Sequence, residues 1–540
     1  MHSGGKLNSM TSAFKQLNPF EIKSALNSLL NKIISPSDIQ NCLADFEMLD
    51  AQEDKTFLAK LLFKELSNCS KEKIPVICFL LERYVEKDIL INKFWEMLKN
   101  TSLDSEVKIT IINLLREMDA DWSYKDCEEV LGNDAAEILD ANTKQLLDSA
   151  IINPEVQIDF MDFLASIRVQ DKITLLNSFG QDFGDDALAN ILIPVFESEP
   201  NSPQGLEALK LLGETKSQFA LNVLERMNNI VKGEISQNIR KSLAKLKMAG
   251  IREDNTKDFY KKILSNTKPD KFYITYPDGH GDMAMIFTRI TEEKRIRFVS
   301  IVINIEFGIK DCFGFFDISQ FECDKILERF LKDERTAAIS SVDFKTILYN
   351  AEKISREHDF GKLPYEYVCW KNLLADVDFE DKSIEQILKE QIMPEKINDK
   401  IFEKLDEMKV SKHWFLDEKY SKEFLKVIKE LKSTDNPDDL IEKYTEIVFY
   451  PEEKDLWKKK LLISSFIKYS VGKVEEAVEI YSLLFDENLM EKFFQNLLKR
   501  SIYEYLMTIK YNKDLNREQF TPQEIDNKIE YIEKKWVKNV

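Results

Sequence analysis

The sequence predicts a mainly α-helical protein with one small antiparallel β module near its middle. Three observations lead to this fold class. The 540 residues include only 15 glycines and 14 prolines, which is sparse for a loop-rich all-β fold. Apolar residues recur at intervals of three and four over most of the chain, which is the helical period. Between residues 271 and 307 the period changes to two, which is typical of strands.

A chain of this length exceeds what one compact core supports, so we expect several domains. The changes in periodicity divide it into a flexible tail, a helical repeat domain, a small α+β module and an irregular C-terminal helical domain. We place these four parts at residues 1–17, 18–255, 256–340 and 341–540.

Segments of the N-terminal half repeat one apolar pattern. The segment "SEVKITIINLLREM" (105–118) aligns without a gap with "PEVQIDFMDFLASI" (154–167), and "QGLEALKLLGET" (204–215) is a third copy. An earlier relative is "EKIPVICFLLERY" (72–84). Short links rich in Asn, Asp, Ser, Pro and Gly separate the amphipathic runs. Because one helix pair cannot cover its own apolar face, such pairs are expected to stack into a solenoid.

This pattern resembles the HEAT-repeat family of α-solenoids over roughly residues 18–250, most closely in "EALKLLGE" (207–214). The repeat period in this chain is longer than is usual in that family. HEAT-like proteins are mostly scaffolds and adaptors, and a minority carry enzymatic roles. The resemblance therefore implies a scaffold that presents a helical surface to a protein partner.

The central region predicts a three-stranded antiparallel meander with strands at 271–276, 283–289 and 295–307. The polar stretch "TEEK" (291–294) is the expected hairpin connection. Helices are expected on either side of the strands, at "KDFYKKILSN" (257–266) and "QFECDKILERFLKD" (320–333).

Residues 271–316 resemble a segment of uncharacterised bacterial proteins. The resemblance lies in "GDMAMIF" (281–287) and "GIKDCFG" (308–314). A small zinc knuckle accompanies this segment in some of those proteins, but its cysteines are absent here, so the resemblance implies no metal role. The richness in Lys, Ile, Asn and Phe is compatible with an AT-rich bacterial genome.

The loop "YPDGHGDM" (276–283) is the first candidate for chemistry. Asp278, His280 and Asp282 place two carboxylates and an imidazole within five residues. Such groups can bind a cation, and a His beside carboxylates can act as a general base. Asp-Gly and Gly-Asp are also ordinary turn dipeptides. The sequence favours the turn and leaves a metal-dependent or hydrolytic module as the alternative.

A second candidate is "FGIKDCF" (307–313), where Cys312 follows Lys310 and Asp311. A charged neighbour could activate a thiol. The preferred interpretation is again a turn, in which Gly308 frees the backbone after a long strand. If the two loops lie side by side, Lys310 and Asp311 join Asp278, His280 and Asp282 as the best candidate site in the chain.

Other signals of chemistry are weak. The seven cysteines form no C-x-x-C pair, and two of the other histidines, His358 and His413, are expected to be structural. We therefore expect no metal and no cofactor. In the C-terminal half, "EEAVEIYSLL" (475–484) resembles the second half of a tetratricopeptide repeat, but the repeat's Trp-Leu-Gly positions are missing and no 34-residue period recurs.

The charge distribution indicates the class of partner. The chain carries a net charge of −19, and residues 101–200 hold 21 acidic residues against 6 basic ones. Such a block repels nucleic-acid phosphates and attracts basic proteins. No apolar stretch of 18 residues and no secretory leader is present, so we expect a cytoplasmic protein without a membrane partner. The sequence favours a non-enzymatic scaffold or adaptor that uses an acidic α-solenoid surface to bind a protein partner with a basic surface.

Overall fold

The computed structural model describes residues 17–32, 46, 49–50, 52, 55–68, 73–100, 102–118, 149–179, 184–252, 263–264, 266–358, 362–416, 418–431, 437–511 and 520–535. Residues Met1–Leu146 and Leu147–Val540 form two compact units. Almost all of the tail expected at 1–17, and most of the helix expected at 257–266, lie outside the described residues.

The N-terminal unit is helical. Its helices are α1 (Pro19–Lys32), α3 (Thr56–Leu66), α4 (Ile74–Tyr84), α5 (Lys87–Leu98) and α6 (Ser105–Glu117). Leucine, isoleucine and phenylalanine side chains from all five helices form one core, with Leu29, Leu62, Leu80, Phe94 and Ile111 fully buried. Burying such apolar faces is what stabilises helices that are individually too short to persist in water.

The second unit begins with a helical array. It comprises α9 (Pro154–Ser166), α10 (Val169–Ser178), α11 (Asp185–Ser198), α12 (Pro203–Leu212), α13 (Gln218–Ile230) and α14 (Glu234–Met248). The side chains of Asn153, Ser202 and Ser217 cap α9, α12 and α13 by accepting backbone N–H groups of the first turn. The segments at 105–118, 154–167 and 204–215 are helices, as predicted.

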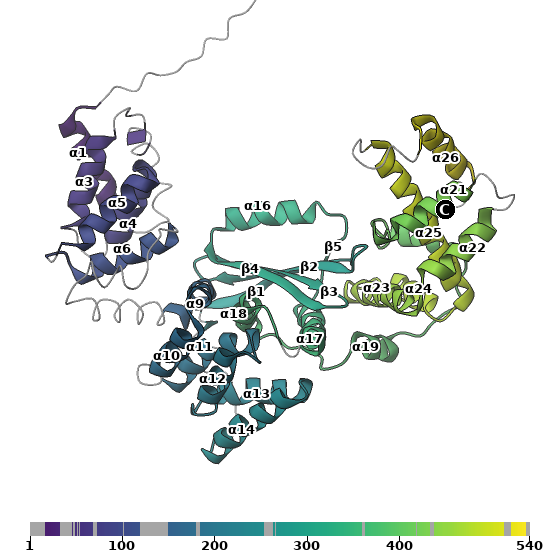
Figure 1. The fold of residues 1–540 in the computed structure, drawn as a ribbon, viewed down its shortest axis with the longest axis horizontal. Helices are drawn as coiled ribbons and strands as arrows, with labels where there is room; N and C mark the ends of the chain where they lie inside the picture. The colour runs from purple at the N-terminus through teal and green to yellow at the C-terminus, as the bar shows by residue number, and fades with distance from the viewer. Residues whose placement is uncertain are drawn as a thin grey trace, which may run out of the picture. The chain divides into compact units, whose positions relative to one another are not determined.

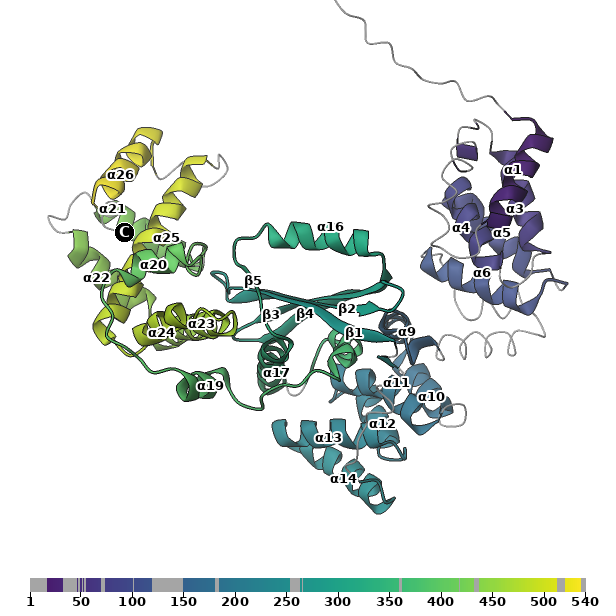
Figure 2. The ribbon, with the colours of Figure 1, turned by 180° about the vertical axis from the view of Figure 1, so that it is seen from behind.

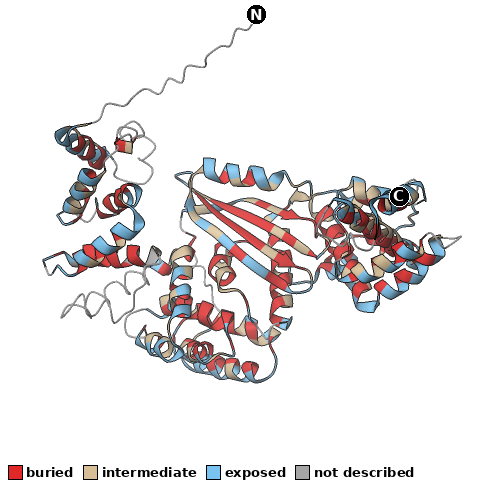
Figure 3. Ribbon diagram, turned by 45° about the horizontal axis from the view of Figure 1, so that its top comes forward, coloured by how far each residue is buried: buried red, intermediate tan, exposed pale blue. Residues whose placement is uncertain are grey.

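A five-stranded antiparallel sheet follows the array. Its strands are β1 (Thr267–Thr275), β2 (Asp282–Thr291), β3 (Ile296–Asn304), β4 (Gly308–Ile318) and β5 (Thr336–Ala338), in the order β4-β3-β2-β1-β5. Helix α16 (Gln320–Leu331) covers one face, and α17 (Ser341–His358) and α18 (Tyr365–Trp370) cover the other (Figure 1 and Figure 2). Buried residues therefore run along the strands in Figure 3.

The prediction of three strands was wrong, because the sheet has five. Of residues 307–313, interpreted as a turn, only Phe307 belongs to the turn, and the chain continues as β4 from Gly308. This edge strand exposes alternate residues, so charged residues and glycine interrupt its apolar period. Strand β5 has only three residues, too few to show a period. The hairpin connection at 291–294 is present, with Lys294 at a φ of 61°.

The rest of the second unit is helical. After the 3₁₀ turn η5 (Lys371–Leu374) come α19 (Ile384–Gln391), α20 (Ile401–Glu407), η6 (Glu418–Tyr420), α21 (Ser421–Glu430), α22 (Pro437–Val448), α23 (Pro451–Ser470), α24 (Val474–Leu483), α25 (Glu487–Tyr511) and α26 (Pro522–Lys535). The mainly α fold with one small sheet is thus confirmed. Among the described residues, no helix combines the length and hydropathy needed to cross a membrane.

Candidate functional site

The carboxylate of Asp278 organises the turn between β1 and β2. Its Oδ1 accepts the backbone N–H groups of His280 at 2.9 Å and Asp282 at 3.0 Å. The backbone closes the same turn, because Gly281 donates to the carbonyl of Asp278. Gly281 has a φ of 81°, a conformation that disfavours residues with a Cβ. These contacts are those of an Asx turn, the structural alternative that the sequence favours.

Asp282 and Lys310 lie together, so the two candidate loops are neighbours. The Lys310 ammonium is 2.8 Å from Oδ2 of Asp282, and the side-chain amide of Asn304 donates to Oδ1 at 2.6 Å. The same amide donates to the carbonyl of His280 at 3.0 Å. Both carboxylate oxygens of Asp282 therefore serve to fasten the loop to β3 and β4.

The other two candidates, Asp311 and His280, are not part of this ion pair. Lys310 is the extra residue of a β-bulge in β4, because Val302 and Ile303 of β3 pair with Asp311 and Ile309. The Oδ1 of Asp311 accepts the N–H of its neighbour Cys312 at 2.8 Å. Burial raises the pKa of the Cys312 thiol well above its usual value, so Cys312 is no activated nucleophile. His280 is exposed at the tip of the loop. The ion pair of Asp282 with Lys310 is thus the contact that links the two candidate loops.

The C-terminal helical region covers the loop, which the sequence did not indicate. The indole N–H of Trp414 donates to the carbonyl of Pro277 at 2.7 Å, and the Lys460 ammonium donates to the carbonyl of Gly279 at 2.5 Å. A Cβ on Gly279 would come within 2.8 Å of the Phe415 carbonyl oxygen. The loop is thus a joint between the sheet and the C-terminal helices, and we call it the 276–282 joint.

Lys460 of α23 is fully buried in this joint. Its ammonium lies 3.4 Å from the centre of the Trp457 ring. Burial lowers the pKa of Lys460 to about 7, against the opposing effect of Glu453, Asp278 and Glu306. Glu453 is itself held by the hydroxyl of Tyr420 at 2.7 Å and the indole of Trp457 at 3.1 Å.

A buried charge network joins the helical array to the helices under the sheet. The guanidinium of Arg356 in α17 is 2.9 Å from both Glu197 of α11 and Glu352. Lys371 binds Glu197 at 2.5 Å, and the hydroxyl of Tyr367 donates to Glu352 at 3.1 Å. Burial raises the pKa of Glu352, but Lys371 and Arg356 more than offset this effect and hold it below its usual value.

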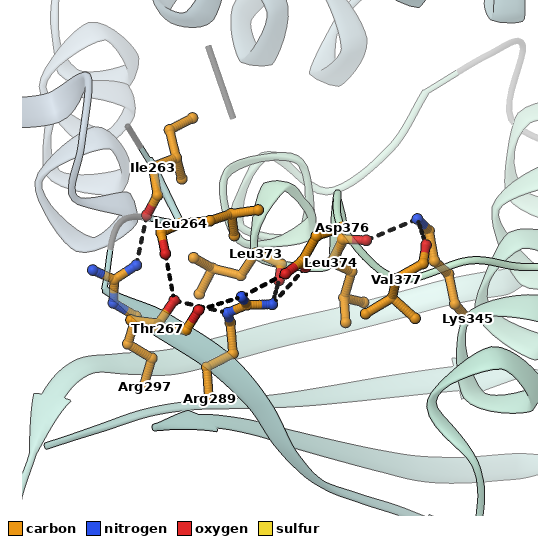
Figure 4. A network of polar contacts seen from close by, with 10 residues as sticks. All are labelled: Ile263, Leu264, Thr267, Arg289, Arg297, Lys345, Leu373, Leu374, Asp376 and Val377. Carbon is orange, nitrogen blue, oxygen red and sulfur yellow. Dashed lines mark hydrogen bonds and ion pairs between the residues drawn. The ribbon is translucent and has the colours of Figure 1, made fainter. Parts of the chain in front are cut away.

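A second network fastens the turn after α18 to the sheet (Figure 4). The buried guanidinium of Arg289 binds both carboxylate oxygens of Asp376, at 2.7 and 2.8 Å, and the carbonyl of Leu373 at 2.8 Å. Lys345 donates to the carbonyls of Leu374 and Val377, and burial lowers its pKa to about 8. Arg297 donates to the carbonyl of Ile263 at 2.6 Å. Each of these three cations donates to a backbone carbonyl, and Arg289 also binds a carboxylate.

Several acidic residues of the 101–200 block also form contacts within the protein. Glu155 accepts the backbone N–H of Phe316 at the outer edge of β4, and Asp162 accepts the hydroxyl of Tyr365. Glu197 lies in the charge network described above. Residues 119–148, which hold nine of the acidic residues in the block, lie outside the described residues.

A pocket of about 820 Å³ lies next to the 276–282 joint. Its walls come from α9, α10, the end of α11, the start of α12, the turn between β3 and β4, the end of α17 and the start of α18. Lys310 contributes to its wall as well as to the joint. A pocket of this volume falls within the range of ligand-binding sites.

The comparisons with known proteins identify no family for this chain. No protein-family model, curated protein or solved structure matches the chain. Within the described ranges, no group of three or more His, Cys, Asp or Glu side chains has the arrangement of a metal site. The function is therefore argued from the contacts themselves.

Proposed function

We propose that this chain is a non-enzymatic protein-interaction scaffold. The observation that carries the proposal is the use made of the 276–282 joint. Its carboxylates bind backbone N–H groups, an amide and a lysine, and its carbonyls accept from Trp414 and Lys460. The carboxylates of Asp278 and Asp282 thus hold the loop to the sheet, and its carbonyls hold it to the C-terminal helices.

The two charge networks support the same role. Arg356 and Glu197 connect α17 to the helical array, and Arg289 and Asp376 connect the sheet to the turn after α18. Both arginines are buried, so displacing either from its carboxylate would leave a buried charge uncompensated. Helices held in this way around a sheet provide a fixed frame for a partner.

We propose further that the helices at 72–84 and 105–118 in the first unit, and those at 154–167 and 204–215 in the second, are HEAT-like repeats. The supporting observation is that three aligned apolar positions are buried in each of three segments: Ile111, Ile112 and Leu115 in α6, Phe160, Met161 and Leu164 in α9, and Ala208, Leu209 and Leu212 in α12. Arrays of this kind offer extended surfaces to other proteins.

The proposed partner has a basic surface. The support is the excess of acidic residues in residues 101–200, and above all the nine between 119 and 148. Electrostatic attraction of this kind speeds association and weakens as salt screens the charges. A complex formed through this block is therefore sensitive to ionic strength.

The test is affinity purification of the tagged full-length chain from its native lysate at low and high salt, with mass spectrometry of bound proteins and metals. A six-residue variant converts to amides Asp126, Glu128, Glu129, Asp134, Glu137 and Asp140. A control converts six exposed acidic residues of the C-terminal helices: Glu442, Glu446, Glu452, Asp455, Glu475 and Glu487.

The proposal expects one basic protein in fixed stoichiometry, which is lost at high salt and lost with the first variant but retained by the control. A stoichiometric metal with no protein partner would overturn it. Equal loss of the partner with both variants would show that the binding surface lies outside the 101–200 block.

A further inference from the structure

The pocket between the helical array and the β3–β4 turn has an apolar wall. Met161, Leu164, Leu176, Val195, Ile309 and Leu363 line it, and these six side chains belong to different helices, a strand and a loop. Phe307 extends the apolar surface at the turn, half exposed and in edge contact with the ring of His358 at 4.9 Å between centroids. An apolar wall of this extent favours ligands that bring an apolar side chain.

Basic side chains are the second feature of this pocket. Lys172 of α10 and Lys362 line it, together with His358. Neither Lys172 nor Lys362 forms an ion pair with any residue that the structure describes. Glu199 and Glu366 also line the pocket, so the lining has four basic side chains, Lys172, Lys310, Lys362 and His358, against two carboxylates. The two lysines without an ion pair complement carboxylates of a partner.

We infer that this pocket binds a short acidic peptide segment of a partner protein, one that carries an apolar side chain between acidic residues. An acidic peptide supplies the two complementary groups: carboxylates for Lys172 and Lys362, and an apolar side chain for the wall. The inference rests on the proposed scaffold function. The pocket would be a second binding surface, and it is basic, whereas the 101–200 block is acidic.

The experiment selects peptides from a random heptapeptide display library on the immobilised full-length protein. The enriched sequence is then synthesised, and its Kd is measured by fluorescence anisotropy. The pocket variant is Lys172→Glu with Lys362→Glu. The matched control is Lys232→Glu with Lys458→Glu, which changes the net charge equally at exposed lysines outside the pocket. A third variant, Ala165→Trp, fills the pocket from an exposed position.

We expect enriched peptides with Asp or Glu on both sides of Leu, Ile or Phe. Their Kd should rise at least about tenfold in the pocket variant and in Ala165→Trp, and stay within about twofold in the control. Circular dichroism melting of every variant checks that the fold is kept. Should Ala165→Trp melt early, the lysine variant alone decides.

Enrichment of neutral or basic peptides, no enrichment at all, or equal affinity for the lysine variant and its control would overturn the inference. Failure here with a salt-sensitive partner still recovered from the lysate would remove only the pocket inference. Failure of both experiments would remove the scaffold function as well.

Discussion

The side-chain amide of Gln157 in α9 donates to the backbone carbonyl of Asn190 in α11 at 2.7 Å. That carbonyl lies four residues before Pro194, which is inside the helix and has no N–H to donate to it. Gln157 thus supplies, from a neighbouring helix, the hydrogen bond that the proline removes. Both side chains are buried, so water cannot replace this bond.

Replacing Gln157 by Leu should therefore lower the free energy of unfolding by about 1–3 kcal/mol, because the Asn190 carbonyl is left unpaired. The same replacement should cost clearly less in a Pro194→Ala background, where residue 194 donates its own N–H. Urea unfolding of the four proteins followed by circular dichroism gives this double-mutant cycle. Equal costs in the two backgrounds would contradict the explanation.

Two fully buried tryptophans test the hydrogen bond that ties the joint to the C-terminal helices. The indole of Trp414 donates to Pro277, whereas the indole nitrogen of Trp370 has no partner within the described ranges. Trp→Phe removes a similar volume at each site. We expect Trp414→Phe to be less stable than Trp370→Phe by about 1–3 kcal/mol, since only the former leaves a buried carbonyl unpaired. Chemical unfolding that ranks the two variants equally would show that the bond contributes little.

Local patterns predicted the helices well because their signals lie within a few residues. The Asn153-Pro154 and Ser202-Pro203 pairs place a capping side chain before a proline, and both begin helices. The sequence pattern did not predict strand β4, because Lys310, Asp311 and Gly314 interrupt its apolar alternation. An edge strand buried on one face needs no continuous apolar run.

The contacts of the candidate site are only partly predictable from the sequence. The meeting of Asp282 with Lys310, 28 positions apart, could be anticipated, since a meander of two hairpins brings the start of β2 and the start of β4 to the same end of the sheet. The contacts of Trp414 with Pro277 and of Lys460 with Gly279 span 137 and 181 positions. No local pattern encodes such separations. The loop at 276–282 carries the candidate chemical groups identified in the sequence. The residues that cover it are distant in the sequence and reach it only through tertiary packing.

The buried amine of Lys460 predicts a dependence of stability on pH. Its pKa falls from 10.5 to about 7 in the folded protein, with Glu453, Asp278, Glu306 and Lys419 as the charged groups around it. Between these two values the unfolded chain holds a proton that the native state has released. The free energy of unfolding therefore rises with pH in this window, by up to about 1.4 kcal/mol per unit.

Lys460→Met should lose this rise between about pH 7.5 and 9.5, so the difference in stability between the two proteins should change across that range. The exposed neighbour Lys458 gives the control, because Lys458→Met leaves the buried amine in place. Urea unfolding at four pH values measures the three slopes. A Lys460→Met slope equal to that of the wild type would mean that the amine stays protonated throughout.

Gln204→Leu tests whether the unpaired oxygen of Gln204 weakens folding. A buried acceptor without a partner costs free energy in the folded state. The Oε1 of Gln204 has no partner among the described residues, and the Glu199 that accepts from its Nε2 is exposed and can turn to water. We expect the free energy of unfolding of Gln204→Leu, measured by urea unfolding, to be unchanged or higher by up to about 1 kcal/mol. Gln157→Leu, which removes a paired amide of the same size, should do the opposite and weaken folding. If Gln204→Leu lowered stability as much as Gln157→Leu, the unpaired oxygen would have a partner in the folded chain.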